Sequence, residues 1–168
     1  MTIRMDELIK SVAVALDIVE SKLIGASNNH GKRIAALCSL MGKELGMDTE
    51  EIRAVTTCAL FHDNALTEYI LSERASGELR EINLMLHCEY GQHNIETLPF
   101  KSSVEGLVLY HHEQADGGGP FGKRDGEFPA GAELIAIADM VDVSHHLQRM
   151  PLENLSALQI EIQAQRGR

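Results

Sequence analysis

Two adjacent histidines, His111 and His112, stand just before a glycine-rich stretch, and a His-Asp pair, His62 and Asp63, stands earlier in the chain. Imidazole nitrogens and carboxylate oxygens together make the mixed ligand sets that divalent transition metals occupy in proteins. Three further residues of these types lie in separate segments, namely His30, His87 and Asp139. The pattern predicts a metal site assembled from several parts of the chain.

Each candidate taken alone also has an ordinary structural explanation. A histidine near the C-terminus of a helix is commonly an exposed cation stabilised by the helix dipole. Asp139 follows the apolar residues 134–138, and a buried carboxylate without a partner is costly, so pairing or metal binding explains it better. Five imidazoles plus two carboxylates exceed the needs of one tetrahedral site. This favours two metals that share a bridging carboxylate, and iron or manganese suits the mixed ligation.

Hydrophobic periodicity indicates the elements that carry these ligands. Apolar residues recur at helical spacing over residues 6–24, 34–45, 52–60, 78–90, 102–113, 130–146 and 152–163. Asn28 or Asn29 is suited to cap the second helix, and Gly46 is suited to end it. Asp48 and Glu51 have the spacing of a capping box for the third. We therefore expect an all-α bundle of about six or seven helices whose ends converge on one cavity.

The composition agrees with one helical domain covering residues 1–168. The chain is 44% hydrophobic but only 4% aromatic and has no Trp, so aliphatic residues must form the core. The net charge of −10 and the absence of a basic stripe argue against binding of a nucleic-acid polymer. No apolar stretch in the sequence predicts a membrane span or a signal peptide.

The cysteines are odd in number and form no C-x-x-C pair, which is typical of free thiols in a reducing compartment. We expect a cytoplasmic protein in which Cys38 and Cys58 are small core residues.

Five segments in order resemble the HD-GYP branch of the HD phosphohydrolase superfamily: ALDIVE followed by NHGKRIA, then ALFHD, HCEYG, YHHEQADGGGPFG and ELIAIADMVD. The resemblance covers nearly the whole chain. It implies an HD-domain-like helical fold and metal-dependent hydrolysis of cyclic di-GMP.

The resemblance also implies roles for single residues. Asp63 would bridge two divalent metals at the catalytic centre. The remaining ligands would be His30, His62 and Asp139 on one metal, and His87, His111 and His112 on the other. Water between the two cations would lose a proton near neutral pH and attack phosphorus. The histidines outside this set, expected at the surface, are His93, His145 and His146.

Three departures from the family pattern bear on the substrate and the metals. Ala65 and Leu66 stand where the family usually has Gly-Lys after the HD pair. Ala26 stands where three-metal members have an additional glutamate, so two metals are expected. The Gly-Tyr-Pro signature is also altered, because residues 117–121 read GGGPF.

Glycine and proline predict that residues 117–129 form a loop. Gly117, Gly118 and Gly119 can adopt positive φ and bring backbone amides to a substrate phosphate or a partner surface. Lys123 and Arg124 are candidates for contact with phosphate or guanine, with a solvated loop tip as the alternative.

Three functions stay open. The first is a cyclic di-GMP phosphodiesterase, supported by the complete ligand set. The second is an HD phosphohydrolase for another nucleotide or phosphoester, suggested by the altered loop. The third is a catalytically weak signalling module that binds ligand or docks a cyclase or regulatory domain, suggested by the missing lysine.

Overall fold

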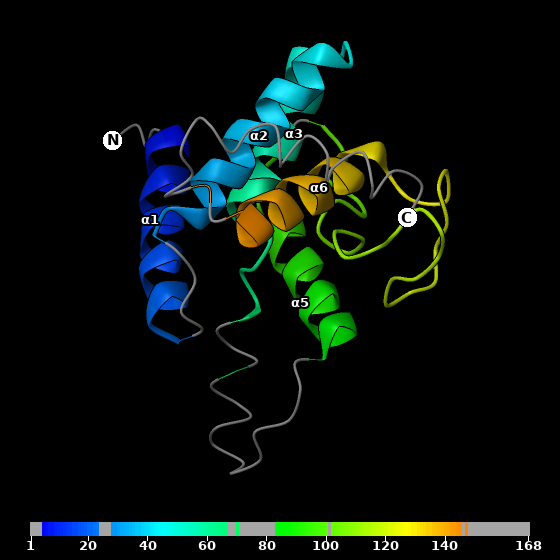
Figure 1. Ribbon diagram of the computed structural model, residues 1–168. Helices are drawn as coiled ribbons and strands as arrows, with labels where there is room; N and C mark the ends of the chain where they lie inside the picture. Colours follow the sequence, from blue (N-terminus) through cyan, green and yellow to red (C-terminus); the bar gives the residue numbers. More distant parts are fainter. Residues whose placement is uncertain are drawn as a thin grey trace.

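The computed structural model describes residues 5–23, 28–66, 70, 83–100, 102–145 and 147, and these contain five helices (Figure 1). The helices are α1 (Met5–Leu23), α2 (His30–Glu44), α3 (Thr49–Leu60), α5 (Leu84–Glu96) and α6 (Ala130–His145). Within these ranges there is no strand, and an isolated antiparallel bridge joins Asp116 to Arg124. The predicted all-α class is confirmed, although the predicted count of six or seven helices is too high for the described part. The helix predicted over residues 152–163 lies outside it.

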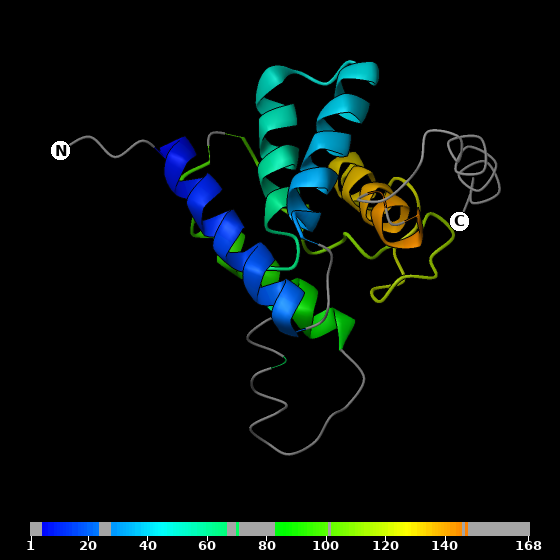
Figure 2. The same cartoon turned by 60° about the vertical axis from the view of Figure 1, so that its left-hand side comes forward.

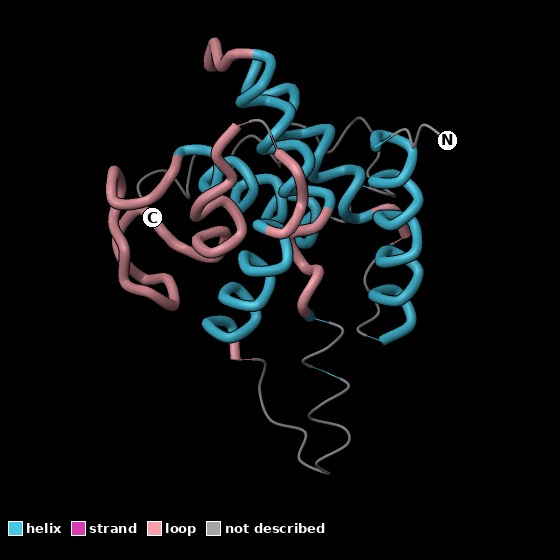
Figure 3. Tube along the Cα trace, turned by 180° about the vertical axis from the view of Figure 1, so that it is seen from behind, coloured by secondary structure: helices cyan, strands magenta, loops and turns pink. Residues whose placement is uncertain are grey.

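Helices α2 and α3 lie side by side, and α6 packs against both of them (Figure 2). Helix α1 contacts α2 on the side away from the long loop of residues 113–129 (Figure 3). None of the described helices combines the length and the apolar character needed to cross a membrane.

The capping predictions differ in outcome. The capping box of α3 is confirmed, because the Asp48 carboxylate accepts from the amide of Glu51 while Glu51 Oε2 accepts from the Asp48 amide at 2.8 Å. Helix α2 does begin after Asn29, but the Asn29 side chain makes no capping bond and φ is 61°. Its Oδ1 accepts from Lys32 Nζ instead, at 2.7 Å.

The helix predicted over residues 102–113 is wrong, because the chain there forms consecutive turns. Gly106 has a φ of 75°, which a right-handed helix does not permit. The apolar spacing in this stretch reflects burial against the core; the buried side chains are Val104, Leu107, Val108 and His111. His111 and His112 are thus carried by turns rather than by the end of a helix.

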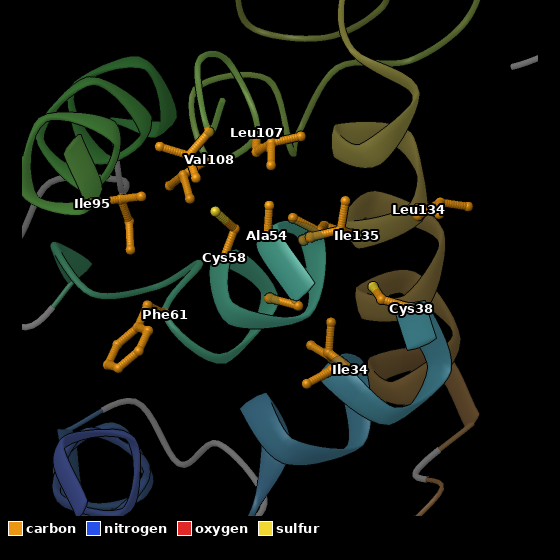
Figure 4. Close-up of a cluster of buried hydrophobic side chains, with 14 of the residues drawn as sticks. Ile34, Cys38, Ala54, Cys58, Phe61, Ile95, Leu107, Val108, Leu134 and Ile135 are labelled. Atoms are coloured by element: carbon orange, nitrogen blue, oxygen red, sulfur yellow. The ribbon is translucent and has the colours of Figure 1, made fainter. Parts of the chain in front are cut away.

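The core lies between α2, α3 and α6, and the turns of residues 104–109 close it on one side (Figure 4). Cys38 and Cys58 are fully buried within it, as predicted. The labelled members come from four helices and the turns: Ile34, Cys38, Ala54, Cys58, Phe61, Ile95, Leu107, Val108, Leu134 and Ile135. This packing brings the end of α3, the start of α2 and the turns together.

Candidate metal centre

His62 and Asp63 lie in the turn that follows α3. His62 Nδ1 lies 2.9 Å from the carbonyl oxygen of Ala59, so this nitrogen donates and Nε2 is left to face the site. Asn64 Nδ2 donates to the carbonyl of Gly91 at 3.0 Å. The turn is therefore fixed both to the end of its own helix and to α5.

The first group of candidate ligands consists of His30, His62 and Asp139, whose ligand atoms all lie within 4.8 Å of one another. His30 Nε2 lies 3.2 Å from Asp139 Oδ1, and His62 Nε2 lies 4.0 Å from the same oxygen. These residues come from the start of α2, the turn after α3 and the middle of α6. Two helices and a turn thus present one carboxylate and two imidazoles to one point.

The second group consists of His87, Cys88, His111 and His112, again with ligand atoms within 4.8 Å of one another. His111 Nδ1 donates to the carbonyl of Val108 at 2.6 Å, which leaves Nε2 available. Cys88 Sγ lies 3.8 Å from that same Nδ1. Burial raises the pKa of the Cys88 thiol to about 12, so it supports the ring as a neutral thiol. The three imidazoles are the better ligands.

Asp63 lies between the two groups. Its Oδ2 is 3.3 Å from His62 Nε2, whereas its Oδ1 is 3.1 Å from His87 Nε2 and 4.0 Å from His111 Nε2. Burial raises the pKa of Asp63, but the neighbouring histidines outweigh it and hold the pKa well below its usual range. An ionised carboxylate with one oxygen toward each group has the arrangement of a bridging ligand.

Among the described side chains, several of these nitrogens are buried without a hydrogen-bond partner: His62 Nε2, His87 Nδ1, His87 Nε2 and His111 Nε2. Burying an unpaired polar atom is costly, and metal coordination would satisfy the Nε2 atoms. Burial also lowers the pKa of His111 and His112, which favours the neutral imidazole that ligation requires. The residues present therefore fit divalent transition metals.

Asp142 on α6 supports the first group, and the sequence analysis did not identify it. Its Oδ2 lies 2.7 Å from His30 Nδ1, and Arg33 donates to both of its oxygens at 2.5 and 2.7 Å. Burial lowers the pKa of His30, but the bonds with Asp139 and Asp142 prevail and raise it to about 10. The carboxylates thus favour positive charge at this position, whether it is a proton on His30 or a bound cation. The sequence does contain a clue to Asp142, because it follows Asp139 by three residues and so lies on the same face of the helix.

Gln92 on α5 supports the second group, and it too was not predicted. Its Oε1 accepts from the amides of Val108 and Leu109, at 3.0 and 3.1 Å. Its Nε2 donates to the carbonyl of Val104 at 3.0 Å and to Glu96 Oε1 at 2.9 Å. One buried side-chain amide thus supplies hydrogen bonds that a helix would have made within its own backbone.

A family model described as an HD domain matches residues 13–164. The chain belongs to the HD domain family. The resemblance of the five segments is thereby confirmed at the level of the HD superfamily.

Two curated relatives give this HD domain a closer context. It is 28% identical, over 80% of its own length and 32% of the relative's, to the 3'3'-cGAMP-specific phosphodiesterase 1 of Vibrio cholerae serotype O1. It is 27% identical, over 86% of its own length and 40% of the relative's, to the cyclic di-GMP phosphodiesterase response regulator RpfG of Xanthomonas campestris pv. campestris. The HD domain studied here thus spans less than half of either relative.

Helix α1 adds two buried carboxylates to the HD domain that sequence reasoning missed. Asp17 Oδ1 accepts from the amide of Gly31, directly after His30, at 3.2 Å. Glu20 is 6% exposed, and burial together with repulsion from Asp63 raises its pKa to about 7. With a pKa of about 7, Glu20 is only partly ionised near neutral pH, and a cation bound beside it would favour its ionised form.

The three glycines predicted to present backbone amides to a substrate do not all adopt the predicted conformation. Of the run Gly117–Gly119, only Gly117 has a positive φ, at 86°. The Gly117 amide donates to the carbonyl of Gln114, and the Gly118 amide donates to Asp116 Oδ1, each at 2.9 Å. Both amides are thus used within the loop, and their contact with substrate stays a prediction.

Lys123 is half-buried and Arg124 is exposed on the same loop. Their contact with substrate also stays a prediction. Ala65 and Leu66, which replace the family's Gly-Lys, are buried with 0% and 6% exposure, so neither position offers a charged side chain to a substrate.

Of the histidines expected at the surface, His93 is exposed. The side chain of His145 lies outside the described residues, as do His146 and Ala26.

Proposed function

We propose that this HD domain is a metal-dependent phosphodiesterase of the HD-GYP type that hydrolyses cyclic di-GMP. The observation that carries the proposal is the position of Asp63, which lies with one oxygen toward His62 and the other toward His87 and His111. Such an arrangement suits two divalent metals, with iron or manganese preferred for the mixed nitrogen and oxygen ligands.

Bound at this position, a pair of divalent metals would supply an activated water nucleophile and neutralise charge on the phosphate. The chain's own residues would hold that pair in place. The proposed ligands are His30, His62 and Asp139 for one ion and His87, His111 and His112 for the other, with Asp63 shared. Asp142 fixes the ring of His30, and hydrogen bonding to a ligating histidine of this kind fixes its tautomer and orientation.

The substrate class follows from charge and from the relatives. A chain with a net charge of −10 needs a local positive centre to attract a phosphodiester, and bound divalent metals would provide one. Lys123 and Arg124 are proposed to contact the phosphate or guanine groups, on a loop that Gly117 and Gly118 shape. Both relatives are named as phosphodiesterases of cyclic dinucleotides.

A second candidate substrate is 3'3'-cGAMP, because one relative is named as specific for it. It shares both phosphodiester linkages with cyclic di-GMP and differs in one base, so base contacts would decide between them. Both relatives are longer than this chain and one is named as a response regulator, which supports a regulatory domain as the proposed partner, with a cyclase domain as the alternative.

The test is a comparison of substrates on metal-loaded protein. The chain is purified without oxygen, loaded with iron(II) or manganese(II), and assayed by chromatography with cyclic di-GMP, 3'3'-cGAMP and linear dinucleotides. We expect linear dinucleotide or mononucleotide products from cyclic di-GMP. The variant Asp63→Asn should abolish turnover, whereas His93→Ala, which removes an exposed histidine, should retain it. Full metal loading with binding but no hydrolysis would instead identify a catalytically weak signalling module.

A further inference from the structure

Glu113 follows the two adjacent histidines directly, and its side chain is turned into the protein rather than toward solvent. It is 4% exposed. Its Oε1 accepts from the amide of Phe121 at 2.8 Å, and its Oε2 accepts from the amide of Lys123. One carboxylate therefore joins the end of the ligand-bearing turns to the far side of the glycine loop.

The loop runs so close to Glu113 that one position must be glycine. A Cβ atom on Gly119 would overlap both the carboxylate and the Cα of Glu113. The run of glycines is thus explained by close approach to this side chain as well as by turn geometry. Any side chain at position 119 would push the loop off the carboxylate.

The backbone of the basic pair Lys123–Arg124 is held by carboxylates on both residues. The Lys123 amide donates to Glu113, and the Arg124 amide donates to Glu127 Oε2 at 2.8 Å. The next amide, of Asp125, donates to the carbonyl of Ala115 at 3.1 Å. Glu113 is buried and the Glu127 side chain is exposed, so the bond from the Lys123 amide to Glu113 is better protected from water than the bond from the Arg124 amide to Glu127.

We infer that Glu113 is a positioning residue that sets the distance between the metal ligand His112 and the basic pair Lys123–Arg124. The inference deepens the proposed function and rests on it, since the pair is taken to contact the substrate. Loss of the carboxylate would release the loop without removing any metal ligand. Substrate binding would weaken, and the metal centre itself would be retained.

The test uses metal-loaded protein with Glu113→Gln, and Glu127→Gln as the matched control on the same loop. A glutamine would turn an N–H group toward one of the two amides and so lose at least one bond. We expect trypsin to cut after Lys123 or Arg124 faster by about tenfold or more, as located by mass spectrometry, with metal content unchanged. The control should change cleavage much less.

Catalysis gives the second measurement. Glu113→Gln should raise KM for cyclic di-GMP and leave kcat within a small factor, while hydrolysis of bis(p-nitrophenyl) phosphate, too small to reach the loop, stays unchanged. If Glu113→Gln does not fold, Glu113→Asp, which keeps the charge on a shorter side chain, is used and should show a smaller effect in the same direction.

The two ideas fail in different ways. Trypsin cleavage no faster than in Glu127→Gln would overturn the positioning role, whatever the substrate is. Absence of turnover of any cyclic dinucleotide by the metal-loaded wild type would overturn the proposed function, while the cleavage rates would still decide whether Glu113 holds the loop.

Discussion

The two halves of the candidate metal centre are built in different ways. In the half containing His30, His62 and Asp139, which we call the helical half, His30 and Asp139 lie on α2 and α6 and His62 lies in the turn directly after α3. The outer support of this half is the ionic pair of Asp142 and Arg33. In the other half, which we call the turn half, His87 lies on α5 but His111 and His112 lie in turns. The side-chain amide of Gln92 holds these turns by hydrogen bonds to their backbone.

The electrostatics of the halves differ as well. Carboxylates next to His30 raise its pKa to about 10, so this half favours a positive charge. In the other half, burial and neighbouring imidazoles lower the pKa of His111, which keeps that ring neutral. The comparison teaches that one half relies on an ionic pair that contacts a candidate ligand, whereas the other relies on the hydrogen bonds of one side-chain amide to the backbone of the turns.

The largest effect should come from Asp63→Asn, because Asp63 lies between the two halves with one oxygen toward each. The change keeps the size of the side chain and removes its charge. We expect turnover to be lost and the metal content to fall from about two ions per chain to one or fewer. Elemental analysis after gel filtration measures this. Asp125→Asn, at an exposed carboxylate, serves as the control and should bind metal as the wild type does.

Gln92→Ala should damage the turn half most. It leaves buried amides and a carbonyl without partners, and each unsatisfied group costs about 1–3 kcal/mol. The free energy of unfolding of the metal-free protein should therefore fall by about 3 kcal/mol or more in urea denaturation. The control Gln114→Ala removes an exposed side-chain amide and should change the free energy of unfolding little. An unfolding free energy for Gln92→Ala equal to that of this control would show that the turns do not depend on Gln92.

Asp142→Asn should act on the helical half alone. Loss of a carboxylate that supports a ligating histidine typically costs about 10- to 100-fold in metal affinity. Calorimetric titration with manganese(II) should show one site weakened by about this factor and the other unchanged. Equal weakening of both sites would contradict the division into halves.

The smallest effect should come from Asp48→Ala, which removes the capping box at the end of α3 remote from His62. We expect a loss of about 1 kcal/mol in unfolding free energy, with metal affinity unchanged at both sites. Asp48→Ser retains a capping oxygen and should recover most of the loss. A change in metal affinity would mean that the helix start is coupled to the site.

The sequence predicted features that depend on local pattern. The candidate ligands, which the fold gathers into two groups, are identified by residue type and motif, and the capping box of α3 is encoded within four consecutive residues. Spacing failed over residues 102–113, because burial of Val104, Leu107 and Val108 produces helical periodicity even where Gly106 breaks the helix.

The supporting residues could not be predicted in the same way. Gln92 is an ordinary polar residue on a helix until the turns fold against it, and Glu113 gains its role only when the loop returns to it. Asp142 has a local clue in its spacing from Asp139, but its partners His30 and Arg33 lie over a hundred positions earlier in the chain. Such roles are defined by tertiary contacts rather than by neighbours in sequence.

The most direct test is an anomalous diffraction measurement on crystals of the manganese-loaded chain. The account predicts two peaks about 3.5–4 Å apart, one beside His30, His62 and Asp139 and the other beside His87, His111 and His112, with Asp63 between them. A single peak, or two peaks that do not share Asp63, would contradict it.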